Sequence, residues 1–321
     1  MEKLLEISDL NVEYRTERAV ANALNGLNLA LEKGESLGLV GESGAGKTTT
    51  ALSILNLLPK GTGYITKGSI KFNGKSVLDM SKKELMETRG EKISMIFQNP
   101  LTALNPVFTV GEQIAMVLRK HKNMKNEEAI QEAKKLLEIV GIAGYRVNDY
   151  PNQFSGGMRQ RVGIAAGIAC NPELLIADEP TTALDVTIQA QILELMKDLQ
   201  KKYSTSLLMI THNLGIVSEL CEKVAVMYAG RIIEYGTVQE VFRNPAHPYT
   251  IGLLGAIPTL GEKRDRLSAI PGIVADARDL PDGCSFNPRC ESCQESCKKQ
   301  SPKMICINQN HFVACCKYTG E

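Results

Sequence analysis

Short apolar runs recur along the chain, separated by longer segments in which apolar residues have helical spacing. The runs Ser36–Val40, Leu174–Glu179, Ser206–Ile210 and Val224–Tyr228 carry no charge apart from the two acids that end the second. Continuous runs of this kind are typical of strands buried on both faces of a parallel sheet. The alternation of such strands with helical segments predicts an α/β fold.

Two other patterns lie outside this core. From about 99 to 165 the apolar period becomes helical, notably over Asn126–Ile139, which predicts an inserted helical subdomain. Residues Ser69–Gly74 end in an Asn-Gly hairpin signal and predict an antiparallel β arm near the N-terminus.

Further on, a tight Ala229-Gly230 link joins two strands, and Thr237–Glu240 has the form of a capping box that opens a short helix.

Residues 41–48 read Gly-Glu-Ser-Gly-Ala-Gly-Lys-Thr, a complete phosphate-loop motif between an apolar strand and a helix-compatible stretch. Its glycines let the backbone wrap around a pyrophosphate, and the following helix adds its positive N-terminal end. We expect Lys47 to bind the β- and γ-phosphates and Thr48 to offer its hydroxyl to Mg²⁺. The predicted nucleotide-binding residues of this segment are Gly41, Ser43, Gly44, Ala45, Gly46, Lys47, Thr48 and Thr49.

Polar residues end the apolar runs at positions where ligands sit in open α/β sheets. Asp178 is expected to hold Mg²⁺ through water, and Glu179 to act as the base for the attacking water, although two solvated acids would look the same. His212 is expected to reach the γ-phosphate, whereas a lone histidine after a strand is often structural. Gln98 follows another short apolar strand and could contact Mg²⁺ or water.

A second phosphate-recognition element lies in Phe154–Arg161. Here Ser155, Gly156 and Gly157 precede a helix-like stretch that runs to Ala169, so a hydroxyl, bare backbone N–H groups and a helix dipole converge. A capped helix without a ligand would also carry these residues. The chain therefore carries two predicted phosphate-recognition elements but a single phosphate loop.

Together these motifs resemble those of the ATP-binding-cassette (ABC) ATPases over about residues 1–240. Gly41–Thr48 resembles the Walker A motif, Ser155–Met158 the signature and Leu174–Glu179 the Walker B motif. Gln98 resembles the Q-loop residue, Ala183–Asp185 the D-loop and His212 the switch histidine.

The resemblance implies a P-loop NTPase core in which two cassettes pack head to tail. ATP would lie between the phosphate loop of one cassette and the signature of the other, so that Ser155, Gly156, Gly157 and Asp185 would face the partner's ATP. Met158 departs from the family's usual Gln. Tyr14 lies where the family stacks an aromatic ring on adenine, although a ring in an amphipathic strand could equally be packing.

Composition changes this picture little. The 321 residues are 43% hydrophobic with a net charge of +1, which gives no reason to expect nucleic acid or an anionic membrane as partner. No stretch approaches the roughly 18 apolar residues of a membrane span, and the start lacks the apolar core of a secretion signal. We expect a peripheral protein at the cytoplasmic face of the membrane, held there by other chains.

The last 38 residues hold seven of the nine cysteines. We expect residues 241–321 to form an extension whose segment 281–321 is too short to fold without disulfides or metal. Disulfides are disfavoured in a reducing cytosol, which leaves metal as the favoured alternative to unstapled buried thiols. A Cys290-x-x-Cys293 pair would suit zinc, and four thiolates would suit either zinc or a [4Fe–4S] cluster.

This tail resembles the C-terminal extension of dipeptide and oligopeptide importer ATPases. The resemblance implies a four-iron cluster on Cys284, Cys290, Cys297 and Cys315, with Zn²⁺ as the alternative. Three cysteines are surplus to that set, and any of them could replace one of its members, namely Cys293, Cys306 and Cys316.

The resemblance implies an ATP-hydrolysing subunit that powers import of dipeptides or oligopeptides. Its partners would be a second, probably different, ABC ATPase subunit, two membrane-spanning permeases and an extracytoplasmic peptide-binding protein. A nickel or other small-solute importer of the same branch is an alternative, since this subunit does not touch the cargo. A soluble ABC ATPase that acts on nucleic acid or ribosomes is disfavoured by the near-neutral charge and the lack of a basic tract.

Overall fold

A computed structural model describes residues 2–98, 103–182, 184–256 and 270–319. The chain folds into two compact units. Unit 1 comprises Met1–Leu4, Leu31–Ser36 and Asp79–Ile210, and unit 2 comprises Leu5–Ala30, Leu37–Leu78 and Thr211–Glu321. Among the helices within the described ranges, none has both the length and the apolar character needed to cross a membrane.

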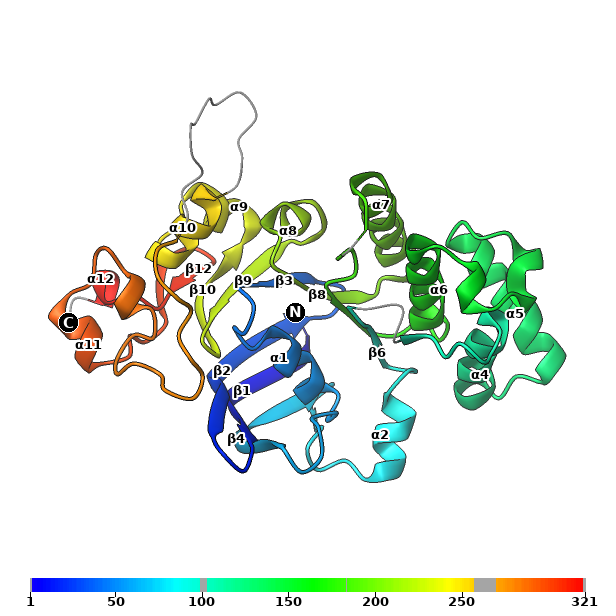
Figure 1. Cartoon of the computed structure of the whole chain (residues 1–321), viewed down its shortest axis with the longest axis horizontal. Helices are drawn as coiled ribbons and strands as arrows, with labels where there is room; N and C mark the ends of the chain where they lie inside the picture. Colours follow the sequence, from blue (N-terminus) through cyan, green and yellow to red (C-terminus); the bar gives the residue numbers. More distant parts are fainter. Residues whose placement is uncertain (1, 99–102, 183, 257–269, 320–321) are drawn as a thin grey trace. The chain divides into compact units, whose positions relative to one another are not determined.

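Unit 1 contains a parallel sheet and a group of helices (Figure 1). The strands β6 (Ile93–Ile96), β7 (Leu174–Asp178) and β8 (Ser206–Thr211) pair in that order, with Ile93 opposite Leu174 and Leu174 opposite Ser206. Every residue of β7 and β8 is buried, as their continuous apolar runs predicted.

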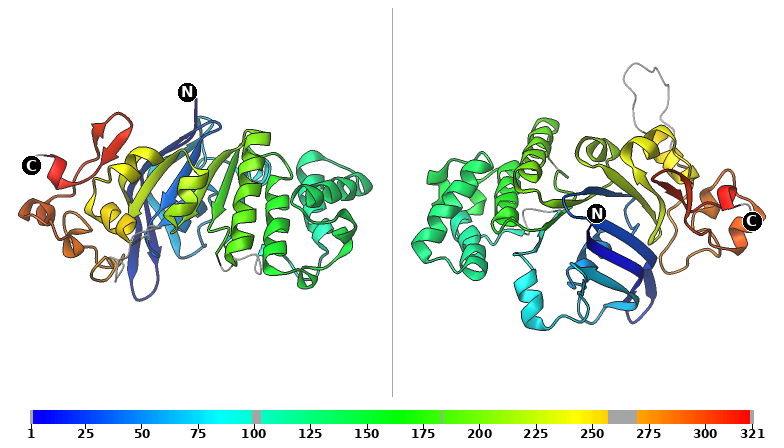
Figure 2. Two further views of the ribbon diagram at one scale, coloured as in Figure 1. Left: turned by 90° about the horizontal axis from the view of Figure 1, so that it is seen from above. Right: turned by 180° about the vertical axis from the view of Figure 1, so that it is seen from behind.

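The helices of unit 1 include the predicted one at 126–139, which the structure forms with both bounds as predicted. It is α5 (Asn126–Ile139), and it packs beside α4 (Val110–Lys122), as Figures 1 and 2 show. The others are α2 (Lys82–Thr88), α6 (Gly156–Ile168), α7 (Val186–Tyr203) and two 3₁₀ turns, Gly144–Asn148 and Pro151–Gln153. Positions 99–102, where the predicted helical subdomain begins, lie outside the described residues.

Unit 2 begins with the predicted antiparallel β arm. Its strand order is β2 (Val20–Glu32), β1 (Lys3–Arg15), β4 (Gly63–Phe72) and β5 (Lys75–Ser76). The Asn-Gly signal is confirmed, because Asn73 and Gly74 both have positive φ and connect β4 to β5.

A second set of strands in unit 2 includes β3, which leads into the phosphate loop. The strand β3 (Ser36–Val40) runs parallel to β9 (Lys223–Tyr228), which pairs antiparallel with β10 (Arg231–Thr237). Strands β12 (His311–Val313) and β11 (Ile305–Asn308) continue this edge. The helices of unit 2 are α1 (Lys47–Ile54), α8 (Leu214–Leu220), α9 (Val238–Arg243), α10 (Pro248–Gly255), α11 (Glu295–Lys299) and α12 (Cys316–Thr319).

The main sheet, predicted to be parallel, is mixed in this half, where β10 runs antiparallel to β9. Ala229 and Gly230 have φ of 45° and 78°, so they form a tight turn that returns the chain antiparallel to β9. A parallel return would need a crossover of a dozen or more residues.

The cysteine-rich tail is built onto this sheet, because β12 pairs with β10 through Glu234 opposite Val313. Beneath the pair, the buried Glu234 carboxylate accepts the backbone N–H groups of Ala246 and His247, each at 2.8 Å, and contacts His311 Nε2 at 2.8 Å. The tail is therefore joined to the cassette by strand pairing and by the hydrogen bonds of Glu234. A domain boundary at residue 240 stays a prediction, as do the limits of the helical subdomain.

Candidate nucleotide site and cysteine centre

The phosphate loop of unit 2 joins β3 to α1 along a tightly packed path. Gly46 at the start of α1 has φ 103°, and a Cβ there would lie 2.6 Å from the carbonyl oxygen of Ala23, so only glycine fits. Lys47 is 7% exposed, and its Nζ donates to the carbonyl oxygens of Gly41 at 2.7 Å and Glu42 at 2.9 Å. The Lys47 side chain is thus hydrogen-bonded to the backbone of its own loop.

The other predicted nucleotide-binding residues of unit 2 lie around the start of α1. Ser43, Gly44 and Thr48 are exposed, as contact with a ligand requires, whereas Ala45 is buried. Thr49 is also buried, and its Oγ1 lies 3.3 Å from the hydroxyl of Tyr14 on β1. The structure therefore brings the predicted adenine-stacking residue to the loop's helix. His212 lies at the exposed end of β8, next to α8, whose N-terminus Asn213 caps.

In unit 1, the structure brings together two of the three predicted catalytic residues. The Glu179 side-chain Oε2 accepts hydrogen bonds from Gln98 Nε2 at 2.8 Å and from Thr182 Oγ1 at 3.0 Å. The Glu179 backbone has φ 45°, and its N–H donates to the Ile210 carbonyl oxygen at 2.8 Å. The carboxylate is thus oriented by two neutral donors on a backbone in an unusual conformation, a combination common at functional sites. Asp178, 3% exposed, precedes it at the end of β7.

The predicted catalytic and metal residues are divided between the units. Lys47, Thr48 and His212 belong to unit 2, and Asp178, Glu179 and Gln98 belong to unit 1. Their convergence on one triphosphate is therefore a proposal, taken up below.

The signature residues begin α6. Ser155 caps this helix, with its Oγ accepting the Met158 N–H at 3.4 Å, and both Ser155 and Gly156 are exposed. Gly157 is buried against the side chain of Ile188 on α7. Met158, the departure from the family pattern, accepts a weak contact from Arg146 Nη1 at 3.6 Å through its sulfur.

Asp185 of the predicted D-loop caps α7 by accepting the Ile188 N–H at 2.9 Å. It is exposed, as is the neighbouring Val186. Ala183, the first residue of the predicted D-loop, lies outside the described residues.

The four cysteines predicted as cluster ligands line one cavity of unit 2. Cys284, Cys290, Cys297 and Cys315 surround it together with Cys316 and His247, whereas Cys293 and Cys306 are not among its lining residues. A close backbone approach brings two of them together. The Cys284 N–H donates to the Cys297 carbonyl oxygen at 2.8 Å, beside Gly283, where φ is 71° and a Cβ would lie 2.2 Å from that oxygen.

Burial raises the pKa of the thiol of Cys284 to about 12 and that of Cys316 to about 11, with repulsion from neighbouring thiolates adding to the effect. Burial also lowers the pKa of His247 to about 3, so this imidazole is neutral, and its Nδ1 accepts the Tyr249 N–H at 3.0 Å. Within the described part of the chain, no group of three or more His, Cys, Asp or Glu side chains is arranged to hold a single metal ion. The metal therefore stays a prediction.

Sequence reasoning missed one contact of the phosphate loop. The Glu42 side chain, inside the Walker A segment, forms an ion pair with Arg289 of the tail. The residues are 247 positions apart, and no motif or periodicity relates positions so distant, so the sequence alone could not have paired them.

Comparison with known proteins identifies the family of the chain. Residues 24–182 match the family described as ABC transporter, and residues 233–297 match the family described as oligopeptide/dipeptide transporter, C-terminal region. The oligopeptide transport ATP-binding protein OppD of Bacillus subtilis is 51% identical over 97% of this chain and 88% of its own length. OppD of Salmonella typhimurium is 48% identical over 99% of this chain and 95% of its own.

Among solved structures, a post-hydrolysis dimer of the ATP-binding cassette MJ0796 bound to ADP and Pi matches with a TM-score of 0.66. It is 28% identical and covers 73% of this chain and 98% of its own. The cassette cbiO1 of Clostridium perfringens, part of the transporter complex cbiONQ, matches with a TM-score of 0.64 at 29% identity, over 76% of this chain and 92% of its own. With near-full-length relatives at about half identity, the chain belongs to the ABC transporter ATPases and is the ATPase subunit of an oligopeptide or dipeptide importer.

Proposed function

We propose that this subunit hydrolyses ATP in a pocket shared between two cassettes, and that the closing and opening of this pocket drives peptide import. The observation that carries the proposal is the Gln98–Glu179 hydrogen bond at the end of β7. It gives the candidate base a fixed orientation and joins it to the predicted Q-loop residue, Gln98. Glu179 would accept a proton from the attacking water.

The other predicted site residues would contact the nucleotide and its metal ion. Lys47 would turn from its loop carbonyls to the β- and γ-phosphates, Tyr14 would stack on adenine, and His212 would contact the γ-phosphate. Mg²⁺, when bound, would neutralise phosphate charge, and Thr48, Gln98 and, through water, Asp178 would hold it. Because the Gln98 amide donates its N–H to Glu179, the atom it offers a cation is the carbonyl oxygen Oε1.

The partner cassette supplies the other side of the pocket in this proposal. Ser155 and Gly156 are exposed at the start of α6, and Asp185 is exposed at the start of α7. An exposed helix start of this kind presents a hydroxyl and N–H groups to a phosphate from another molecule. The MJ0796 cassette that this chain resembles was solved as a dimer bound to ADP and Pi.

We expect Ser155→Ala to leave ATP binding by the isolated chain unchanged and to lower ATP turnover of the assembled importer about 10–100-fold, since a charge-assisted hydrogen bond from the partner is lost. Equilibrium ATP binding and steady-state turnover measure the two quantities.

Ser81→Ala is the matched control for Ser155→Ala. Ser81 caps α2 in unit 1 by accepting the N–H of the third helical residue, as Ser155 does in α6, so this variant loses a helix cap but no phosphate contact. If Ser155→Ala lowered the ATP affinity of the isolated chain as much as it lowers turnover of the assembled importer, this result would contradict a pocket shared between cassettes.

The proposed assembly comprises a second cassette, two membrane-spanning permeases and an extracytoplasmic peptide-binding protein, with this chain at the cytoplasmic face. Support comes from the tail, which matches the C-terminal region of oligopeptide/dipeptide transporters. Purification of the tagged full chain from membranes should bring two polytopic proteins with it. Recovery of ribosomes or nucleic acid in their place would favour a non-transport ATPase.

We also propose that the cysteine centre holds a [4Fe–4S] cluster on Cys284, Cys290, Cys297 and Cys315. All four line one cavity, and thiols are the donors that such a cluster requires. In a four-iron cluster each thiolate binds a different iron, so the ligands surround a cavity, whereas zinc draws four ligands to one point. The cavity that the four thiols line is the observation that supports the cluster.

Anaerobically purified protein is expected to be brown and to contain about four irons per chain. Cys297→Ser should lose the iron and the visible absorption. Cys306→Ser is the matched control and should retain both, since Cys306 is exposed and is not among the lining residues of the cavity. Colourless protein with one zinc per chain would overturn the assignment, as would iron retained by Cys297→Ser.

A further inference from the structure

The cysteine-rich tail and the phosphate loop are joined through one side chain, Arg289. It directly precedes the predicted ligand Cys290 and ends a 3₁₀ turn, Asn287–Arg289. Its Nη1 donates to Glu42 Oε2 at 2.7 Å, and its Nη2 donates to Glu42 Oε1 at 3.1 Å. This is the two-pronged guanidinium–carboxylate geometry, which fixes orientation as well as distance.

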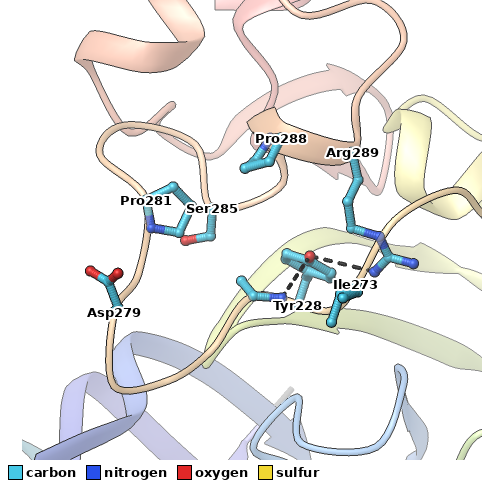
Figure 3. Close-up of a pocket in the computed structure, with 8 residues that line it drawn as sticks. Tyr228, Ile273, Asp279, Pro281, Ser285, Pro288 and Arg289 are labelled. Atoms are coloured by element: carbon cyan, nitrogen blue, oxygen red, sulfur yellow. Dashed lines mark hydrogen bonds between the residues drawn. The ribbon is translucent and has the colours of Figure 1, made fainter.

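Contacts outside the phosphate loop also hold this guanidinium in place. Arg289 Nε donates to the Pro271 carbonyl oxygen at 2.9 Å, and Nη1 lies 3.5 Å from the Tyr228 hydroxyl. The guanidinium carbon is 5.8 Å from the ring centres of both Tyr228 and Phe286. Figure 3 shows Arg289 and Tyr228 at the wall of a cavity, with Ile273 beside them; the cavity has a volume of about 250 Å³.

The burial of the pair makes it matter energetically. The Arg289 side chain is 4% exposed and that of Glu42 is 28% exposed. The Glu42 carboxylate raises the pKa of Arg289 above its usual value, so the guanidinium stays charged. Loss of one partner would leave the other charge poorly solvated, which costs more than loss of a surface pair.

A second contact from the tail side holds the backbone of the same loop residue. The Glu42 N–H donates to the Tyr249 hydroxyl at 2.9 Å, and Tyr249 is fully buried in a ring cluster with Tyr228 and Phe286, at centroid distances of 4.8 and 5.4 Å. The Glu42 carbonyl oxygen in turn accepts Lys47 Nζ at 2.9 Å. Residues beyond the minimal cassette therefore fix the side chain and the N–H of Glu42, next to the lysine expected to bind phosphate.

We propose that Arg289 is a positioning residue for the phosphate loop, so that folding of the cysteine-rich segment sets the affinity for ATP. The inference rests on the proposed role of the loop in binding ATP, and it does not require the cysteine centre to hold iron. Because coupling between two sites is reciprocal, ATP bound at the loop must stabilise the segment by the same factor.

The test compares ATP affinity in the full chain for Arg289→Gln, Glu42→Gln and the double variant, by equilibrium titration with a non-hydrolysable ATP analogue. We expect each single variant to weaken binding about 10-fold, which corresponds to about 1.4 kcal/mol, and the double variant to be no weaker than the singles. Arg289→Lys should rescue only part of the loss, because an ammonium lacks the two-pronged geometry.

Arg278→Gln is the matched control. Arg278 lies in the same part of the chain and pairs with Asp276, but this pair is on the surface and makes no contact with the loop. Its ATP affinity should stay within about twofold of wild type, as a surface pair contributes little.

The direction in which each single variant changes the ATP affinity distinguishes a positioning role of Arg289 from a simple charge effect. If Arg289 acted only as a positive charge near ATP, Arg289→Gln would weaken binding but Glu42→Gln would tighten it, and the double variant would resemble wild type. Tighter binding by Glu42→Gln, or unchanged binding by Arg289→Gln in a wild-type protein that binds ATP, would overturn the inference. A wild-type protein that binds no ATP would instead remove the proposed function of the loop.

Hydrogen exchange supplies a readout that a purely structural role would not move. In wild type, the analogue should slow amide exchange in residues 283–299, and in Arg289→Gln this protection should disappear. If Arg289→Gln unfolds the tail, Tyr249→Phe decides, since it keeps the ring and removes only the hydroxyl that holds the Glu42 N–H. That variant should weaken binding about threefold, within the range of one neutral hydrogen bond, and unchanged affinity and protection would refute the proposal.

Discussion

Replacing Glu179 by glutamine is expected to lower ATP turnover about 10²–10⁴-fold while ATP binding and cassette closure are preserved, because a general base is lost but the shape of the site is kept. The amide can still accept the hydrogen bonds that Gln98 and Thr182 now donate to Oε2, at 2.8 and 3.0 Å. Single-turnover kinetics on the assembled importer, together with ATP affinity, measure the two effects.

Glu194→Gln is the control for this variant. Glu194 is an exposed carboxylate on α7 in the same unit, so its neutralisation changes net charge equally without touching the end of β7. Turnover within a few-fold of wild type in Glu179→Gln would remove Glu179 from the role of base. A large loss of ATP affinity in that variant would show that the carboxylate binds rather than activates.

Replacing Lys47 by alanine is expected to act on binding itself. Its ammonium is the positive group of the phosphate loop, and loss of charged hydrogen bonds to the β- and γ-phosphates should weaken ATP affinity about 100-fold, or about 2.7 kcal/mol. Lys47 Nζ also donates to two loop carbonyl oxygens, so a modest fall in the thermal midpoint of the ligand-free protein is expected as well.

Lys60→Ala serves as the control for Lys47→Ala. Lys60 is an exposed lysine shortly after α1 in unit 2, outside the loop. Calorimetric titration with Mg²⁺ and a non-hydrolysable ATP analogue gives the affinities directly. An affinity of Lys47→Ala within about threefold of that of Lys60→Ala would exclude the lysine from phosphate binding.

The elements that could be predicted from sequence are those with a local cause. The buried runs became β3, β7, β8 and β9 because a central strand must be apolar on both faces. Helix α5 could be bounded because its apolar positions recur every three to four residues between polar ones. The Asn-Gly turn was evident because positive φ favours both of its residues, and in the Ala-Gly turn Gly230 supplies the same signal.

What could not be predicted depends on contacts between distant segments. The antiparallel edge of the sheet includes β12 of the tail, which pairs with β10. No periodicity in β10 specifies this partner. The Gln98–Glu179 contact joins residues 81 positions apart, and Arg289–Glu42 joins residues 247 apart. For the cysteines, composition identified a cluster, but only the fold separates Cys316, which lines the cavity, from Cys293 and Cys306, which do not.

The pairing of β12 with β10 has a consequence for anyone who trims this protein to a minimal cassette. A truncation after residue 240 would bare the hydrogen-bonding edge of β10 and strand the Glu234 carboxylate without the three groups that now satisfy it. Naked strand edges invite intermolecular pairing, and an uncompensated buried anion destabilises its surroundings. Such a shortened chain would precipitate for reasons unrelated to iron, so point substitutions, rather than deletion, are the sound way to dissect the C-terminal part.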